Sequence, residues 1–375
     1  MARAKRQSGQ PATPSSPTAA DQPLLSVVVP IFNVERYLDE CLASLRAQTL
    51  TDFEVICVND GSTDGSRDII QTYLDADPRF RVIDKPNSGY GASMNLGCAA
   101  ATGKYVTILE SDDFLDPACY EVLVGLAERH DVEVVRANFF FYWSQPYPKD
   151  EVCDLIRPAL CDRVVNPQRE HDIFFVKSAI WAGIYRRDFL AANDIGFLET
   201  PGASYQDTGF NFKVWIACTR AWFVQQAYLH YRQDNEASSV NSAGKVYPIC
   251  DEHAEIERYL AARPERAYLD GVRLRVKFDN YLWNYDRLAP QFKPEFLQRM
   301  SQEFAADLAA GKDFSEFNRW QKADVERLAK EPEWFHAAWQ AKDAHGYLSK
   351  ARRYIQTGGP RLLLDVARNK LTRRK

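Results

Sequence analysis

The chain has 375 residues and is 46% hydrophobic, so it is long and apolar enough to bury a full core in one large or two moderate domains. Its formal net charge of −4 gives no overall field that would attract nucleic acid, and no stretch approaches the roughly 20 apolar residues that cross a bilayer. We therefore expect a globular protein that is soluble or peripheral to a membrane and does not bind nucleic acid.

The N-terminal segment and the cysteines indicate the cellular setting. Residues 1–23 are rich in Pro, Ser and Gln and have no apolar centre, which predicts a disordered leader and not a secretory signal. The eight cysteines include no C-x-x-C pair, and several lie inside apolar runs. These features predict reduced, mostly buried thiols and a cytoplasmic protein.

From Leu24 onward, short apolar runs alternate with amphipathic segments. Buried strands are predicted at 25–32, 53–59, 80–83, 105–110 and 132–139. Helices are predicted at 34–48, from 66, after the Gly-rich loop 87–91, and up to 129, the last with Asp116 as its cap and Pro117 as its first residue. Strands that alternate with helices imply right-handed crossovers and a mainly parallel sheet flanked by helices, so the predicted fold class is α/β.

Beyond about Val246 the strand pattern ends. The segments 253–262, 266–283 and 294–310 predict helices with many aromatic residues. The predicted division is a leader over 1–23, an α/β domain over 24–245 and a helical region over 246–375.

The basic tail RLLLDVARNKLTRRK has Leu363, Ala367 and Leu371 on one stripe. This pattern fits either an ordinary terminal helix with a solvated face or a segment that lies on an anionic membrane surface. In the second case the protein would be peripheral at the inner face of the membrane.

Three carboxylates follow alternate predicted strands. Asp60 comes directly after 53–59, and Asp112 and Asp113 follow 105–110 after one serine. Ligands of open parallel sheets bind at the carboxyl ends of the strands, where these side chains would gather. Each motif alone is most simply explained as a turn or a helix cap. Together they predict a site in which Mg²⁺ or Mn²⁺ bridges carboxylates and a nucleotide diphosphate.

These motifs resemble the inverting glycosyltransferases of family 2, which have the GT-A fold. The resemblance covers about 24–241 and includes VVVPIFNVERYL, VNDGSTDGS, LESDDFLDP, WAGIYRRDFL and SYQDTGF in that order. It implies a metal-dependent hexosyl- or N-acetylhexosaminyl-transferase that uses a nucleotide-diphosphate donor, in particular a UDP-sugar. It also implies a glycan or lipid-linked acceptor, a role in surface polysaccharide biosynthesis, and 24–245 as the catalytic domain.

The resemblance assigns roles to individual residues. Asp60 would contact the nucleotide base, Asp113 would bind the metal, and Asp112 would face the ribose or share the metal. Asp207 would be the base that takes the proton of the acceptor hydroxyl in a single inverting displacement. The other residues expected at the site are Pro30, Phe32, Asn87, Gly89 and Arg232 on the donor side, and Trp181 and Gln206 on the acceptor side.

Several positions depart from the family pattern. Gln206 stands where a Glu usually precedes the base, Met94 where an arginine is common, and Ala182 and Gly183 where a polar residue and a lysine usually follow Trp181. Another residue must then offset the negative charge of the donor's phosphates. Arg232 is the candidate, because the donors of a guanidinium suit phosphate oxygens.

Three other functions compete with this one. A nicotinamide oxidoreductase is disfavoured because no G-x-G-x-x-G turn follows the first strand, and a nucleotidyltransferase because no basic, Gly-rich loop lies near that strand. A non-catalytic relative that binds a nucleotide sugar or acts as a scaffold stays open because of Gln206, Met94 and Gly183. The intact aspartates favour an enzyme.

Overall fold

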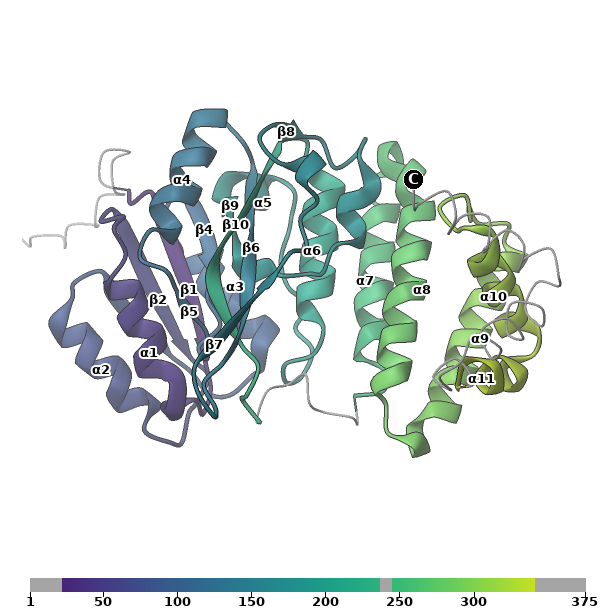
Figure 1. Ribbon diagram of the computed structural model, residues 1–375, viewed down its shortest axis with the longest axis horizontal. Coiled ribbons are helices and arrows are strands. Elements are labelled where there is room, and N and C mark those ends of the chain that lie inside the picture. Colours follow the sequence, from purple (N-terminus) through teal and green to yellow (C-terminus); the bar gives the residue numbers. More distant parts are fainter. Residues whose placement is uncertain (1–21, 237–244, 341–375) are drawn as a thin grey trace, which may run out of the picture.

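The computed structural model describes residues 22–236 and 245–340 (Figure 1). These ranges cover the predicted α/β domain apart from residues 237–244, and the helical region as far as Gln340. The predicted basic tail and most of the predicted leader lie outside them.

A mixed β-sheet forms the centre of the α/β part. Within the described residues its strand order is β3-β2-β1-β4-β9-β6-β10-β5, with β7 paired to β6 and β8 to β10. The strands are β1 (Leu25–Ile31), β2 (Phe53–Asn59), β3 (Phe80–Asp84), β4 (Tyr105–Ile108), β5 (Phe114–Leu115), β6 (Val134–Trp143), β7 (Lys149–Cys153), β8 (Val164–Val165), β9 (Gly183–Arg186) and β10 (Ala221–Arg232).

The first half of the sheet is parallel, as predicted. Strands β3, β2, β1 and β4 run in one direction, and β6 and β10 are parallel to each other. Strand β9 was not predicted and runs antiparallel to both β4 and β6. Gly183 opens β9, where a Cβ atom would lie 2.5 Å from the carbonyl oxygen of Val135. A side chain at this position would push β9 away from β6.

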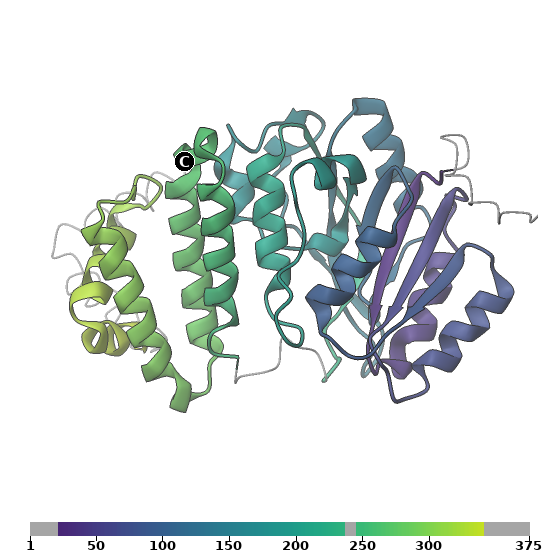
Figure 2. The same cartoon turned by 180° about the vertical axis from the view of Figure 1, so that it is seen from behind.

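Helices cover both faces of the sheet. Figures 1 and 2 show α1 and α2 on one face and α3 on the other. The α-helices are α1 (Glu35–Arg46), α2 (Ser66–Ala76), α3 (Tyr90–Ala100), α4 (Cys119–His130), α5 (Arg187–Ala192), α6 (Gln206–Ala217), α7 (Pro248–Ala261), α8 (Asp270–Arg287), α9 (Lys293–Ala309), α10 (Arg319–Lys330) and α11 (Pro332–Gln340). Every helix in the described ranges is too short or too polar to traverse a lipid bilayer.

Several helix starts differ from the prediction. Helix α7 begins at Pro248 and not at residue 253, and α8 begins at Asp270 and not at residue 266. Helix α4 begins at Cys119, with Ala118 as its N-cap, and not at Pro117. The carbonyl oxygen of Pro117 accepts a hydrogen bond from the backbone N–H of Thr49 at 2.9 Å, and the carboxylate of Asp116 lies 3.3 Å from a ring nitrogen of His230. The Pro117 carbonyl and the Asp116 carboxylate thus contact other parts of the chain, and the helix begins after them.

The C-terminal helices extend the molecule away from the sheet. Figure 1 shows α7 and α8 beside α6, and α9 to α11 beyond them. Two hydrophobic cores are present, and α7 and α8 contribute to both. Ile256 and Val272 belong to the core of the sheet, whereas Cys250 and Phe278 belong to the core of the distal helices. The predicted boundary at 245 therefore lies before two helices that pack against the sheet domain.

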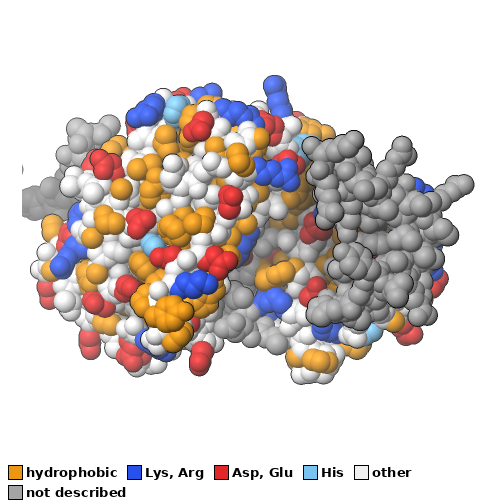
Figure 3. Space-filling view, viewed as in Figure 1, with side chains coloured by type: hydrophobic (Ala, Val, Ile, Leu, Met, Phe, Trp, Pro, Cys, Tyr) orange, Lys and Arg blue, Asp and Glu red, His pale blue; other side chains and the backbone are white. Residues whose placement is uncertain are grey.

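The β6–β7 hairpin projects from the sheet. Figure 3 shows hydrophobic side chains gathered on this part of the surface. Tyr147, in the turn of the hairpin, is 68% exposed, and Val152 in β7 is 55% exposed. The eight cysteines are free thiols, and all but Cys98 and Cys161 are buried, as the sequence predicted.

Candidate active site

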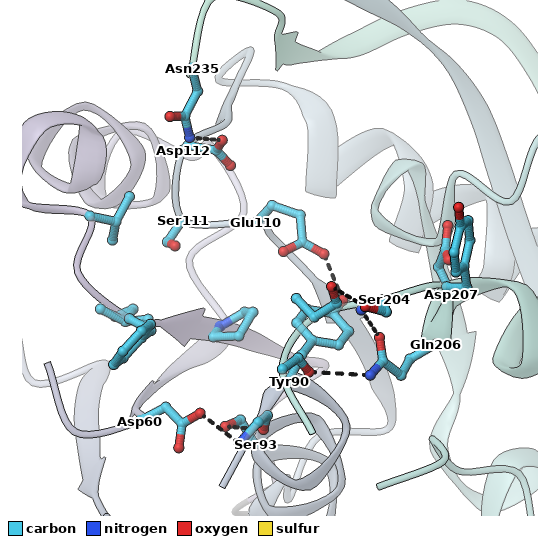
Figure 4. A pocket seen from close by; sticks show the side chains of 18 of the residues that line it. Asp60, Tyr90, Ser93, Glu110, Ser111, Asp112, Ser204, Gln206, Asp207 and Asn235 are labelled. Carbon is cyan, nitrogen blue, oxygen red and sulfur yellow. Dashed lines mark hydrogen bonds between the residues drawn. The ribbon is translucent and has the colours of Figure 1, made fainter. Parts of the chain in front are cut away.

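A cavity of about 730 Å³ opens at the carboxyl ends of β1, β2 and β4, a size that suits a nucleotide-type ligand. Figure 4 shows Asp60, Asp112 and Asp207 around it. Nine of the predicted site residues line it: Pro30, Phe32, Asp60, Asn87, Gly89, Asp112, Trp181, Gln206 and Asp207. Asp113 and Arg232 lie behind its wall.

Asp60 holds the Gly-rich loop. Its backbone N–H donates to the carbonyl oxygen of Ile31 at 2.8 Å, which fixes it at the end of β2. Its carboxylate accepts hydrogen bonds from the N–H groups of Ser88 at 2.8 Å and Gly89 at 3.0 Å, and it forms an ion pair with Lys85. Asp60 thus organises a turn and also faces the cavity.

The Gly-rich loop is docked on the segment that leads to Asp207. Gly89, with φ of +93°, precedes α3, and the N–H of Tyr90 donates to the carbonyl oxygen of Gly202 at 3.1 Å. At Gly91 a Cβ atom would lie 2.1 Å from the carbonyl oxygen of Leu198. The absence of a side chain at Gly91 therefore lets the two segments meet.

The pair Asp112 and Asp113 follows β4. Asp112 accepts a hydrogen bond from the side-chain amide of Asn235 at 2.7 Å. Asp113 is 1% exposed, and its Oδ1 accepts the backbone N–H of Arg232 at 2.9 Å. Its buried Oδ2 has no hydrogen-bond partner among the described residues. Burial raises the pKa of both carboxyls, and the neighbouring Asp112 raises that of Asp113 further.

An unpartnered buried carboxylate oxygen suits a divalent cation. The described residues contain no group of three or more His, Cys, Asp or Glu side chains that would hold a metal alone. A cation on Asp112 and Asp113 would therefore need oxygen ligands from a bound diphosphate or water. Mg²⁺ is commonly bound in this way.

Arg232 is placed differently from its predicted role. Its side chain is 2% exposed, forms an ion pair with Glu40 and packs over the ring of Tyr37 at 4.7 Å. Its Nε–H donates to the carbonyl oxygen of Asp112 at 2.9 Å. Together with its backbone contact to Asp113, this makes Arg232 a positioning residue for the two aspartates and not a wall of the cavity.

Asp207 lies in the first turn of α6, where the helix N-terminus favours negative charge. Tyr205 before it adopts φ of 60°, in the left-handed region. Withdrawal from water raises the pKa of Asp207 to about 6, while the backbone N–H of Thr208, at 2.9 Å, and the charge of Lys177 act in the opposite direction. A carboxylate of this kind is ionised at neutral pH and can accept a proton.

The structure adds Glu110 and Tyr90 to the site. Both line the cavity, and the Tyr90 hydroxyl donates to Glu110 Oε1 at 2.6 Å. Desolvation raises the pKa of Glu110 to about 8, the hydrogen bond from Tyr90 lowers it, and the charges of Asp112 and Asp207 add to the rise. The signal in the sequence was the position of Glu110 directly before Ser-Asp-Asp, at the same strand end.

Gln206 uses its amide to hold a loop. Its Nε2 donates to Thr200 Oγ1 at 2.9 Å and to the carbonyl oxygen of Gly202 at 3.2 Å, and its Oε1 accepts the N–H of Ser204. An ionised Glu has no donor for the first two contacts. The departure from the family pattern thus has a local structural reason.

Two other departures are explained by packing. Met94 is fully buried in α3, and Gly183 has no space for a side chain. Trp181 is 8% exposed, packs on Tyr231 with ring centroids 5.2 Å apart and also lines the cavity, so it is both a core residue and a wall residue. Its Nε1 is buried without a hydrogen-bond partner among the described residues.

The comparisons with known proteins agree with this geometry. Residues 26–171 match the sequence profile of "Glycosyl transferase family 2". The uncharacterized glycosyltransferase EpsJ of Bacillus subtilis (strain 168) is 30% identical over 240 residues, which cover 62% of this chain and 67% of EpsJ. The chain belongs to glycosyltransferase family 2.

Other relatives of this glycosyltransferase extend the match. The uncharacterized glycosyltransferase YibD of Escherichia coli (strain K12) is 28% identical over 289 residues, which cover 73% of this chain and 81% of YibD. The structure of residues 1–349 of Staphylococcus aureus TarS in complex with UDP-GlcNAc aligns with a TM-score of 0.66 at 20% identity, over 86% of this chain and 93% of that one. The predicted family and GT-A fold are confirmed.

Proposed function

We propose that this glycosyltransferase is inverting and metal-dependent. It transfers a hexosyl or N-acetylhexosaminyl group from a UDP-sugar to a hydroxyl of a glycan or lipid-linked acceptor, in the synthesis of a surface polysaccharide. One observation carries the proposal. Asp207, whose pKa is raised to about 6 by burial, lines the same cavity as Asp60 and Asp112.

The donor would lie along the sheet edge. Asp60 and the Gly-rich loop would receive the nucleoside, near Pro30 and Phe32, and the diphosphate would lie towards Asp112. Asp113, with Asp112, would hold Mg²⁺ or Mn²⁺, which when bound offsets negative charge on the diphosphate. Arg232 would keep both carboxylates in place through its contacts to Asp112 and Asp113.

Asp207 would act as the general base. Its carboxylate would accept the proton of the acceptor hydroxyl while that oxygen bonds to the anomeric carbon of the donor and the bond to the diphosphate breaks. UDP leaves with the electron pair of that bond. A single displacement inverts the anomeric centre, so an α-linked donor gives a β-glycoside.

The test is release of UDP from a panel of UDP-sugars with Mn²⁺ or Mg²⁺, with wild type and Asp113→Asn compared. UDP-GlcNAc is the first donor to try, because the structurally similar TarS was crystallised with it. We expect metal-dependent release that is lost in the variant. If the wild type neither binds nor turns over any nucleotide sugar, the non-catalytic alternative replaces this proposal.

A further inference from the structure

The cavity has a second wall that comes from the helical region. Trp283 and Arg287 of α8 and Lys245, just before α7, line it. Trp283 and Arg287 are four residues apart, so they share one face of the helix. The guanidinium carbon of Arg287 lies 4.2 Å from the centroid of the Trp283 ring, and Trp283 as a residue is 49% exposed.

This wall adjoins the proposed base. Tyr205, two residues before Asp207, packs edge-on against Trp283 with ring centroids 5.7 Å apart. The Tyr205 hydroxyl accepts a hydrogen bond from Arg287 Nη1 at 3.0 Å and donates to Asn284. The wall is therefore fixed to the start of α6, the helix that carries Asp207.

The wall carries two neighbouring positive charges. Lys245 Nζ donates to the carbonyl oxygen of Ala203, and desolvation together with the charge of Arg287 lowers the pKa of Lys245. Arg287 forms no salt bridge within the described ranges, and its contacts are to Tyr205 and Trp283. Two cations that repel each other on a partly desolvated wall are stabilised when an anion binds between them.

We propose that Trp283, Arg287 and Lys245 form an acceptor subsite for a sugar unit that carries a phosphate or a carboxylate. The exposed part of the Trp283 ring packs against the apolar face of the unit. Arg287 and Lys245 bind its anionic group, Arg287 through paired N–H donors. This inference rests on the proposed transferase function and names the class of its acceptor.

The experiment uses the full chain and three matched acceptors: p-nitrophenyl β-glucoside, its 6-phosphate and the corresponding β-glucuronide. Arg287→Gln and Lys245→Gln remove one charge each, and Arg287→Lys keeps the charge but loses the paired N–H donors of the guanidinium. The control is Arg258→Gln on α7, where the arginine side chain is 70% exposed. The readouts are KM for each acceptor, binding of UDP, and release of UDP without acceptor.

We expect the wild type to prefer one or both charged acceptors over the glucoside. Arg287→Gln and Lys245→Gln should raise KM for the preferred one on the order of tenfold and should bind UDP as tightly as the wild type. Arg287→Lys should lie between them and the wild type, and Arg258→Gln should match the wild type. Comparison of the 6-phosphate with the glucuronide shows whether the subsite binds a phosphate or a carboxylate.

Two results would overturn the inference. One is equal use of the glucoside and both charged acceptors by the wild type. The other is weaker UDP binding in the Arg287 and Lys245 variants with acceptor preference intact, which would assign the two cations to the donor diphosphate. Failure of the wild type to bind or cleave any UDP-sugar is a separate outcome, because it removes the transferase function itself.

Discussion

Two neighbouring carboxyls in the cavity differ in the state expected at neutral pH. The pKa of Asp207 is about 6 and that of Glu110 is about 8. At pH 7 Asp207 is therefore mainly ionised and Glu110 mainly protonated. Paired acidic groups whose environments separate their pKa values take different roles. This difference supports Asp207, and not Glu110, as the group that takes the proton of the acceptor.

Asp207→Asn should lower turnover by roughly 10²–10⁴-fold, the usual contribution of general base assistance. Binding of UDP should be unchanged, because the substitution leaves Asp60 and Asp112 in place. Titration with UDP and rates of sugar transfer measure the two effects. Full turnover in the variant would exclude Asp207 as the base.

The same assignment predicts the pH dependence of wild-type transfer. As the pH falls through about 6, Asp207 becomes protonated and can no longer accept a proton, so kcat/KM for the acceptor should fall on the acid side. A profile from pH 5 to 8 under saturating donor checks this. A flat profile across pH 6 would contradict it.

The sequence located the aspartates because each follows a buried strand or opens a motif of the family. It did not reveal which way Arg232 faces, since the end of β10 is covered by Glu40 and Tyr37 from a distant helix. Nor did it reveal the task of Gln206, whose partners lie in a loop without regular structure. Both depend on contacts that no local pattern encodes.

At the scale of elements, the docked Gly-rich loop joins the donor side to the base side. Gly91→Ala should place a Cβ atom in contact with the Leu198 carbonyl. Because backbone must shift, we expect a loss of about 1–3 kcal/mol in the free energy of unfolding and weaker UDP binding.

The matched control is Gly125→Ala in α4, where a Cβ atom would meet nothing within 4 Å. This change should stabilise the helix by roughly 0.5–1 kcal/mol and leave UDP binding unchanged. Denaturant unfolding and UDP titration of both variants provide the comparison. Equal effects in the two would show that the loop contact is unimportant.

Secondary structure was predicted best where a strand or helix is defined by its own residues and not by its partners. The strand over 53–59 and the helix from Ser66 begin where the sequence placed them. Strand β9 was missed because it has only four residues, and its pairing depends on β4 and β6. The start of α4 was misplaced because Thr49 and His230 engage the residues that would have capped it.

At the scale of the whole molecule, one buried acid near the site lowers the stability of the fold at high pH. Glu252 on α7 is 1% exposed, and neither carboxylate oxygen has a hydrogen-bond partner among the described residues. Desolvation, then the charge of Asp207, raises its pKa to about 9. A raised folded-state pKa stabilises the protein at low pH, and this stabilisation is lost as the pH rises from about 4.5 towards 9.

Glu252→Gln should remove this pH dependence. We expect the variant to exceed the wild type in stability at pH 8.5 by on the order of 1–3 kcal/mol and to differ much less at pH 5. Denaturant unfolding at both pH values measures it, with Asp251→Asn as an exposed control on the same helix. A variant that is less stable at both pH values would mean that the carboxyl is needed for packing.

Helix α8 connects the distal core to the cavity. It packs among the distal helices at Phe278 and Tyr281 and reaches the cavity at Trp283 and Arg287. Substitutions among α9 to α11 can therefore tilt α8 and move these two residues, while Asp60 and Asp112 stay fixed at the sheet edge. Under the proposed acceptor subsite, acceptor choice would diverge independently of donor choice. A chimera that exchanges the helical region of two relatives should then take its donor preference from one parent and its acceptor preference from the other.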